Sequence, residues 1–381
     1  MLMPEQRISS ALHNSYPASI DQLLQLTVEQ GGSDMHLTVG VPPQARLHGE
    51  LTSLDFPHLY PENIKGLLYR ILSEQQVKQL EEKWELDLSY SISSVARFRG
   101  NIMYQRDSLS AVFRVVPFAV PEFEKLGIPA AVRSICDLTR GLVLVTGPTG
   151  SGKSTTLAAL INIINRERCK NIVTVEDPIE FLHKHRKSTI RQREVGKDTH
   201  SFADALRHVL RHDPDVILIG EMRDLDSIAI ALTAAETGHL VFSTLHTQTA
   251  SLTVSRIVDV FESHRREQVR QQLAGSLRAV ICQQLLPTAD GRGRVPAVEF
   301  MVDTPAVRNM IREGKDRQLY SAIQTGRIQG MQTLDHALSD LCKKGKITRE
   351  TALEYCVDKS ELERLLDNRP EKNERNSLWQ G

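Results

Sequence analysis

Four short apolar runs constrain the fold of this chain more than any other feature. In chain order they are LVLVT at 142–146, NIVTV at 171–175, VILIG at 216–220 and LVFST at 240–244. A strand with one face in water alternates apolar and polar residues, whereas an uninterrupted apolar strand is covered on both faces. Each run is followed by polar or glycine residues and then by a helical pattern. This order predicts an α/β fold with a parallel sheet between layers of helices.

The segment before residue 117 follows a different pattern. Residues 20–30 place apolar groups at helical spacing and end at two glycines. Short β-like runs then alternate with a helical stretch at 64–82, which predicts a separate α+β domain over 1–117. Pro117 and Pro121 mark a short passage between the two patterns, and residues 118–122 are predicted to form a linker.

The second predicted domain covers residues 123–381, and its last part, 303–381, is predicted to be helical. Three short helices are expected there, at 306–314, 333–345 and 348–356, because apolar residues recur at helical spacing and glycine or polar residues follow.

Composition excludes several classes of protein. The 47 Lys and Arg residues balance the 47 Asp and Glu residues, so no overall positive field draws the chain to nucleic acid or to an anionic membrane. The five cysteines are scattered and include no C-x-x-C pair, which favours free thiols in a reducing compartment. No apolar run approaches the roughly 18 residues that span a bilayer. The N-terminus also lacks a basic start followed by an apolar core, so we expect a cytoplasmic protein without a membrane span.

A phosphate-binding loop follows the first apolar run. The sequence from Gly147 to Ser154 completes the pattern G-x-x-x-x-G-K-[ST] between a strand and a predicted helix. Such a loop surrounds the β-phosphate with backbone N–H groups, while Lys153 approaches the γ-phosphate and the Ser154 hydroxyl binds Mg²⁺. ATP and Mg²⁺ are therefore the predicted cofactors. The predicted nucleotide contacts are Gly147, Pro148, Thr149, Gly150, Ser151, Gly152, Lys153, Ser154 and Thr155.

Two carboxylates are candidates for the group that prepares the attacking water. In DPDVILIGEMRD, Gly220 stands where a P-loop protein usually has an aspartate, and Glu221 follows one position later. In VTVEDPIEFLH, Glu180 lies just beyond a strand and a proline turn. Either side chain can act at the sheet edge where nucleotides bind. The sequence leaves open which of the two is the base, and a solvated acid at a strand or helix end is the alternative for each.

Two histidines flank the strand in TGHLVFSTLHT. His246, at the carboxyl end of the strand, is a candidate sensor of the γ-phosphate, and His239, before the strand, is a candidate nucleotide contact. Their separation is not a zinc-binding spacing. A structural role is the alternative for each histidine.

The order of these motifs resembles a known family. GPTGSGKST, VEDPIEF, GEMRD and TGHLVFSTLHT are similar to the Walker A motif, Asp box, atypical Walker B motif and His box of the secretion ATPases that serve type II secretion and type IV pili. GGSDMHL, at 31–37, is similar to the N-terminal signature of that family. The resemblance covers nearly the whole chain. It implies a homo-hexamer whose subunits each join a PAS-like N-terminal domain to a RecA-like P-loop domain.

The resemblance also implies a role for arginines of the N-terminal domain. Arg99 and Arg114 match the family positions that reach the nucleotide, where a guanidinium can neutralise charge on the transferred phosphoryl group. A surface or ion-pair role is the alternative for both.

A C-terminal block points to the retraction ATPases within the family. AVRNMIREGK is similar to their C-terminal signature, and GMQTLDHAL also resembles them. The implied function is pilus retraction, at the inner-membrane base of the pilus machine, through contact with a platform protein. A second retraction ATPase can work beside this one. The predicted coupling residues are Ala306, Val307, Arg308, Asn309, Met310, Ile311, Arg312 and Glu313.

We expect replacement of Ala306, Ile311 or Arg312 to abolish retraction while much of the ATPase activity remains. Secretion and extension ATPases normally carry a further N-terminal domain and a four-cysteine zinc site, neither of which is evident in this sequence. They remain the alternative within the family. A hexameric DNA translocase and a nucleotide-binding scaffold that does not hydrolyse ATP are the alternatives outside it.

Overall fold

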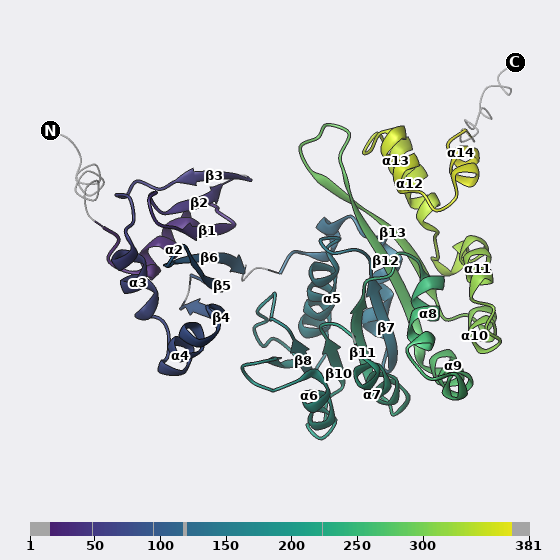
Figure 1. Cartoon of the computed structure of the whole chain (residues 1–381). Helices are drawn as coiled ribbons and strands as arrows, with labels where there is room; N and C mark the ends of the chain where they lie inside the picture. Colours follow the sequence, from purple (N-terminus) through teal and green to yellow (C-terminus); the bar gives the residue numbers. More distant parts are fainter. Residues whose placement is uncertain (1–15, 48, 94, 117–119, 223, 368–381) are drawn as a thin grey trace, which may run out of the picture. The chain divides into compact units, whose positions relative to one another are not determined.

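The computed structural model describes residues 16–47, 49–93, 95–116, 120–222 and 224–367 (Figure 1). The chain divides into two compact units between residues 119 and 120. The expected linker at 118–122 begins outside the described residues. Residues 368–381, the end of the expected helical C-terminal part, also lie outside them.

The first unit is built on an antiparallel sheet with the strand order β3-β2-β1-β6-β5-β4. Its strands are β1 (Asp34–Leu37), β2 (Gln44–Leu47), β3 (Glu50–Ser53), β4 (Glu85–Ile92), β5 (Ala96–Gln105) and β6 (Ser108–Val116). Its helices are α2 (Ile20–Glu29), α3 (Pro61–Tyr69) and α4 (Glu74–Lys83). The helical stretch expected at 64–82 is therefore two helices, because Ser73 caps a new helix with a hydrogen bond from the Gln76 amide.

The second unit is built on a sheet with the order β13-β12-β7-β11-β10-β8-β9. Its strands are β7 (Gly141–Thr146), β8 (Asn171–Glu176), β9 (Thr189–Glu194), β10 (Val216–Ile219), β11 (Leu240–Leu245), β12 (Leu277–Pro287) and β13 (Arg294–Val302). The four expected apolar strands are β7, β8, β10 and β11, and they belong to the parallel part of this sheet.

Alternate residues of the parallel strands pack into two separate cores. Leu142 and Leu144 of β7 face one core, whereas Val143 and Val145 face the other. The first core is covered by α6 (Phe202–Val209), α7 (Leu225–Glu236), α8 (Ala250–Asp259) and α9 (Arg266–Ser276). The second core is covered by α5 (Lys153–Glu167) and a 3-10 segment at Ala130–Asp137. Burial on both faces explains why these strands are uniformly apolar.

Three strands were not expected from the sequence. β9 is a polar edge strand, and β12 and β13 form a long antiparallel hairpin at the other edge (Figure 1). Because β12 begins directly after α9, no turn residues separate the two elements and mark its start.

The helical C-terminal part has more helices than expected. It contains α10 (Pro305–Arg312), α11 (Leu319–Thr325), α12 (Leu334–Lys343), α13 (Arg349–Tyr355) and α14 (Lys359–Asp367). Three of them match the expected positions, whereas α11 and α14 are additional. No helix within the described ranges is both long and apolar enough to cross a membrane.

Candidate nucleotide site

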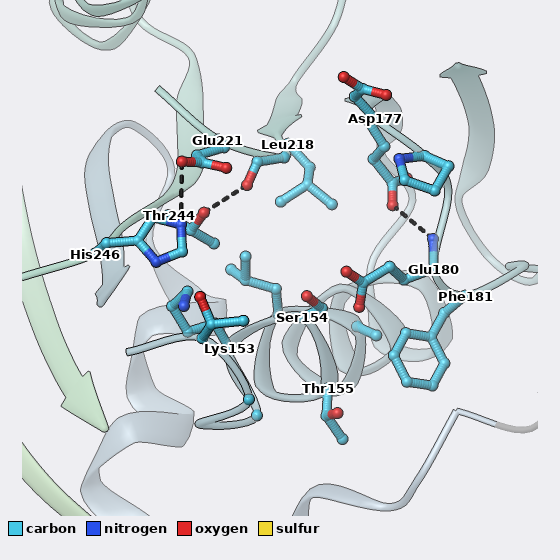
Figure 2. A pocket seen from close by; sticks show the side chains of 18 of the residues that line it. Lys153, Ser154, Thr155, Asp177, Glu180, Phe181, Leu218, Glu221, Thr244 and His246 are labelled. Atoms are coloured by element: carbon cyan, nitrogen blue, oxygen red, sulfur yellow. Dashed lines mark hydrogen bonds and ion pairs between the residues drawn. The ribbon is translucent and has the colours of Figure 1, made fainter. Parts of the chain in front are cut away.

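A pocket of about 490 Å³ lies where β7, β8, β10 and β11 end. Because these strands are parallel, their carboxyl ends meet at one edge of the sheet, which is where ligands bind in open α/β folds. Figure 2 shows Ser154 in the middle of the pocket, with Glu221 and His246 on one side and Glu180 on the other. The structure thus brings together residues from four motifs that are far apart in the sequence.

The phosphate-binding loop takes a conformation that requires glycine. Gly147, Gly150 and Gly152 have φ angles of 142°, 79° and 87°, in the region that side chains disfavour. A Cβ atom on Gly147 would lie 2.1 Å from the carbonyl oxygen of Gln283. Six of the predicted loop residues line the pocket, namely Thr149, Gly150, Gly152, Lys153, Ser154 and Thr155. The other three, Gly147, Pro148 and Ser151, are not part of its lining.

Lys153 begins helix α5, and its ammonium group folds back onto the loop. Its Nζ donates to the carbonyl oxygens of Gly147 at 2.8 Å and Pro148 at 2.9 Å. Burial lowers the pKa of Lys153, while the nearby carboxylates of Glu221 and Glu180 favour the charged form. The charge is thus held beside the loop amides, where the phosphates of a nucleotide bind in P-loop proteins.

Glu221 is held at the end of β10 by its neighbours. A Cβ atom on Gly220 would lie 3.2 Å from the Cα atom of Glu176 on β8, so the close approach of β8 favours glycine at that position. The Thr244 hydroxyl donates to the Gly220 carbonyl at 2.6 Å. These contacts give a physical reason why glycine occupies position 220 and the acid follows one residue later, at Glu221. The Glu221 carboxylate then lies 3.1 Å from Nε2 of His246.

Glu180 follows β8 and a cis peptide bond between Asp177 and Pro178. Its backbone amide donates to Glu176 at 3.4 Å, and its side chain is exposed in the pocket. Glu176 is more deeply placed and accepts hydrogen bonds from Thr174 and Gln192. Burial raises the pKa of Glu176. Glu180 and Glu221 both line the pocket. The choice between them as the base stays open.

The two histidines lie at opposite ends of β11. His246 lines the pocket, whereas His239 precedes the strand and is not part of the pocket lining. Nδ1 of His239 instead lies 3.0 Å from the Ala234 carbonyl oxygen at the end of α7. The structure does not bring His239 to this pocket, because it lies at the amino end of β11 and the ligand-binding edge is at the carboxyl ends of the strands. Its contact with a nucleotide stays a prediction.

The two candidate arginines belong to the first unit. Arg99 on β5 and Arg114 on β6 are partners in the antiparallel register. Nε of Arg114 donates to the Asp34 carboxylate at 2.8 Å. Burial raises the pKa of Asp34, but hydrogen bonds from Ser33 and Arg114 outweigh it and the pKa is lowered. The GGSDMHL segment and Arg114, which the sequence treats as separate features, are thus joined by an ion pair.

The predicted coupling block on α10 is split by the helix period. Val307 and Ile311 are each only 1% exposed and pack in the core beneath the helix. Met310 is half-buried. The exposed residues of the block are Ala306, Arg308, Asn309, Arg312 and Glu313. The side chain of Ile311 faces the core, and its expected role in coupling stays a prediction.

Gln283 on β12 has a role that no sequence pattern indicates. Its Nε2 donates to the Ser151 carbonyl at 2.7 Å, and its Oε1 accepts from the Thr156 hydroxyl at 2.7 Å. The side chain is 4% exposed, so these bonds are shielded from water. Gln283 braces the phosphate-binding loop against the sheet, but the adjacent glutamines Gln283 and Gln284 of β12 belong to no motif.

Comparison with known proteins places the chain in a family. A family model described as type II/IV secretion system protein matches residues 96–374. The chain belongs to this family. It is 50% identical over 335 residues to the type IV pilus retraction ATPase PilT of Pseudomonas aeruginosa, which covers 88% of this chain and 97% of that protein. The family resemblance predicted from the motifs is confirmed.

Two further members of the type II/IV secretion family support the assignment. The type IV pilus ATPase PilU of Pseudomonas aeruginosa is 38% identical over 363 residues, 95% of either chain. A crystal structure of the pilus retraction motor PilT with bound ADP has a TM-score of 0.86 and 50% identity, covering 91% of this chain and all of that one. The chain therefore has the mixed α/β fold of PilT.

Proposed function

We propose that this protein is a hexameric ATP-hydrolysing motor that drives retraction of type IV pili. The observation that carries the proposal is 50% identity to the retraction ATPase PilT over 97% of that protein. The pocket supports it independently, because the phosphate-binding loop is lined up with the candidate bases Glu180 and Glu221 and with His246 in the same pocket. Identity along nearly the whole of PilT favours retraction over extension or secretion by a more distant member of the family.

ATP is the proposed substrate. The loop amides and Lys153 would hold its phosphates, and Lys153 would exchange the carbonyl oxygens of Gly147 and Pro148 for phosphate oxygens. Phe181, Phe202 and Leu285 add apolar lining that suits an adenine ring. The bound ADP in the PilT crystal structure supports nucleotide binding in this fold.

Mg²⁺ is the proposed metal. The Ser154 hydroxyl and the carboxylates of Glu180 and Glu221 line the same pocket, and hard oxygen ligands of this kind suit Mg²⁺, which takes its remaining ligands from phosphates and water. These residues fit the ion, with Ser154 as the proposed direct ligand. When bound, Mg²⁺ supplies positive charge that stabilises the phosphates during transfer.

Hydrolysis requires a water that is oriented and deprotonated beside the γ-phosphate. Glu221 or Glu180 would accept the proton. His246 would sense the γ-phosphate, and its contact with Glu221 at 3.1 Å links the sensor to one candidate base. Loss of the γ-phosphate would then change the contacts of His246 and Glu221 together.

A motor must convert this change into movement. We propose that the first unit is the PAS-like domain and the second the RecA-like domain of a subunit in a six-membered ring. Arg99 and Arg114 would approach the nucleotide and neutralise developing charge. For Arg114 this requires release from Asp34, so the ion pair at 2.8 Å would compete with nucleotide contact.

The partner would be a pilus platform protein at the inner membrane, and the protein would act from the cytoplasm. The exposed residues of α10, including Arg312, are the proposed contact surface. A second retraction ATPase can share the same machine. The balanced charge of the chain gives no support to the alternative of a DNA translocase.

Phosphate release by the purified full chain tests the enzymatic part of this proposal. We expect the wild-type protein to release phosphate from ATP, and Lys153→Ala to lower the rate at least about a hundredfold, because a charge that stabilises the transferred phosphate is lost. A folded wild-type protein that binds ATP without releasing phosphate would identify a nucleotide-binding scaffold and contradict the proposal.

A further inference from the structure

A buried carboxyl group outside the pocket connects two parts of the second unit. Glu299 lies on β13 and is 1% exposed. Its Oε1 accepts a hydrogen bond from the backbone amide of Ala250, the first residue of α8, at 2.7 Å. Its Oε2 is buried and has no hydrogen-bond partner of good geometry among the described residues. A buried carboxyl group of this kind is costly, so its position calls for a physical reason.

On one side, Glu299 supports the loop that carries His246. This loop runs from the end of β11 to Ala250, where α8 begins. The Thr247 hydroxyl lies 2.7 Å from the Thr253 hydroxyl, so the loop is fixed to the first turn of α8. The Ala250 amide and the segment that contains His246 are therefore joined through the first turn of α8.

On the other side, Glu299 faces the beginning of the C-terminal helices. The backbone amide of Leu334, the first residue of α12, favours the charged form of Glu299. The neighbouring residue Phe300 exchanges two backbone hydrogen bonds with Gln332, at 2.9 and 3.1 Å. The carboxyl group thus lies between the amino ends of α8 and α12, and helix amino ends attract negative charge.

The same group is also in register with the strand that enters the phosphate-binding loop. Glu299 pairs with Cys282 on β12, and Cys282 pairs with Thr146, the last residue of β7. Gln283, the next residue of β12, braces the loop. One short path therefore connects the phosphate-binding loop, the His246 loop and α12.

We propose that Glu299 is a positioning residue: its carboxylate holds the amino ends of α8 and α12 together, and thereby fixes the His246 loop for hydrolysis and ties it to the C-terminal helices. This proposal rests on the proposed ATPase function. Protonation would weaken the attraction to both helix ends, because the neutral acid no longer carries the charge that they stabilise. The ionised form is the one that positions the loop.

The pH dependence follows from the surroundings of Glu299. Burial raises its pKa to about 7, while the amides of Ala250 and Leu334 and the Cys282 thiol oppose the rise. Asp335 on α12 favours the neutral form, and the first turn of α8, at 250–253, contains no titratable side chain. Since the folded-state pKa is raised, Glu299 makes the protein less stable as the pH increases from the ordinary carboxyl range toward 7. Positioning and stability therefore change in opposite directions.

The test compares the full-length wild type with Glu299→Gln, which keeps an oxygen for the Ala250 amide but cannot ionise. We expect the kcat of the variant to be about tenfold lower at pH 8, with little change in the Kd for ATP, because misplacement of a group beside the reacting atoms slows the chemical step. The ratio of wild-type to variant kcat should increase from pH 6 to pH 8. Between pH 5 and pH 7.5, the Tm of the variant should also decrease less than that of the wild type.

Asp335→Asn is the matched control, because Asp335 is also buried and accepts hydrogen bonds from Val357, Asp358 and Tyr320. The Ala250 amide of α8 donates to Glu299 instead. Because the charge of Asp335 raises the pKa of Glu299, its removal should move the pH dependence of kcat to lower pH, while kcat at pH 8 stays close to that of the wild type. If Glu299→Gln does not fold, amide hydrogen exchange of the wild type decides: protection of residues 246–253 relative to 319–325 should be greater at pH 8 than at pH 6. A constant kcat ratio or an equal loss of kcat at pH 8 in Asp335→Asn would overturn the proposal. In the exchange experiment, equal relative protection at pH 6 and pH 8 would do the same. A wild type without phosphate release would instead contradict the proposed function.

Discussion

The nucleotide pocket and helix α10 differ in how their residues are used. In the pocket, residues that follow four strands converge on one hollow, because parallel strands end at the same edge of the sheet. On α10, a contiguous block of eight residues is divided by the helix period into buried and exposed positions. A motif therefore indicates which residues act together only when the underlying element directs them to the same place.

The largest expected effect lies in the pocket. Glu221→Gln removes the carboxylate beside His246 without changing its size, and we expect phosphate release to decrease by about a thousandfold if Glu221 is the base. ATP binding should persist, because the phosphate-binding loop is unchanged. Both quantities are measurable on the same purified sample. With Glu180→Gln as the matched control, the larger loss identifies the base, and a small loss in both variants would show that neither carboxylate has this role.

The second expected effect lies beneath α10. Ile311→Ala leaves a cavity in the core, so the free energy of unfolding should decrease by about 2–5 kcal/mol. Phosphate release and retraction should then be lost in parallel as the folded fraction falls. Denaturant unfolding measures the change. An unchanged stability with selective loss of retraction would support Ile311 as a coupling residue and remove the contrast with the pocket.

The smallest expected effect on the isolated protein lies on the exposed side of the same helix. Arg312 is exposed, and Arg312→Ala should change the free energy of unfolding by no more than about 0.5 kcal/mol. Phosphate release should remain close to that of the wild type, whereas pili in cells should no longer shorten. Normal shortening with this variant would exclude Arg312 from the coupling surface.

Much of the second unit could be predicted from the sequence. The apolar runs predicted the central strands because burial on both faces leaves little room for polar residues. The phosphate-binding loop could be located because its glycines are required by backbone geometry at Gly147, Gly150 and Gly152. The family resemblance followed from the order of the motifs, and the comparison with PilT confirmed it. The roles of the individual site residues stay predictions.

Other features could not be predicted because they depend on packing between distant segments. Gln283 and Glu299 are polar residues of the β12–β13 hairpin, and their partners Ser151, Thr156 and Ala250 become neighbours only in the folded sheet. His246 lines the pocket, whereas His239 does not. To predict this, one must know which end of β11 lies at the pocket, and the local sequence pattern does not contain that information.

Pilus shortening in cells tests the central claim most directly, namely that hydrolysis in this pocket drives retraction. The measurement follows labelled surface pili in cells whose own gene carries Lys153→Ala, beside cells with the wild-type gene and equal amounts of folded protein. The account predicts that wild-type pili extend and shorten, whereas pili of the variant extend and remain long. Pili that shorten at the normal rate in the variant would contradict it.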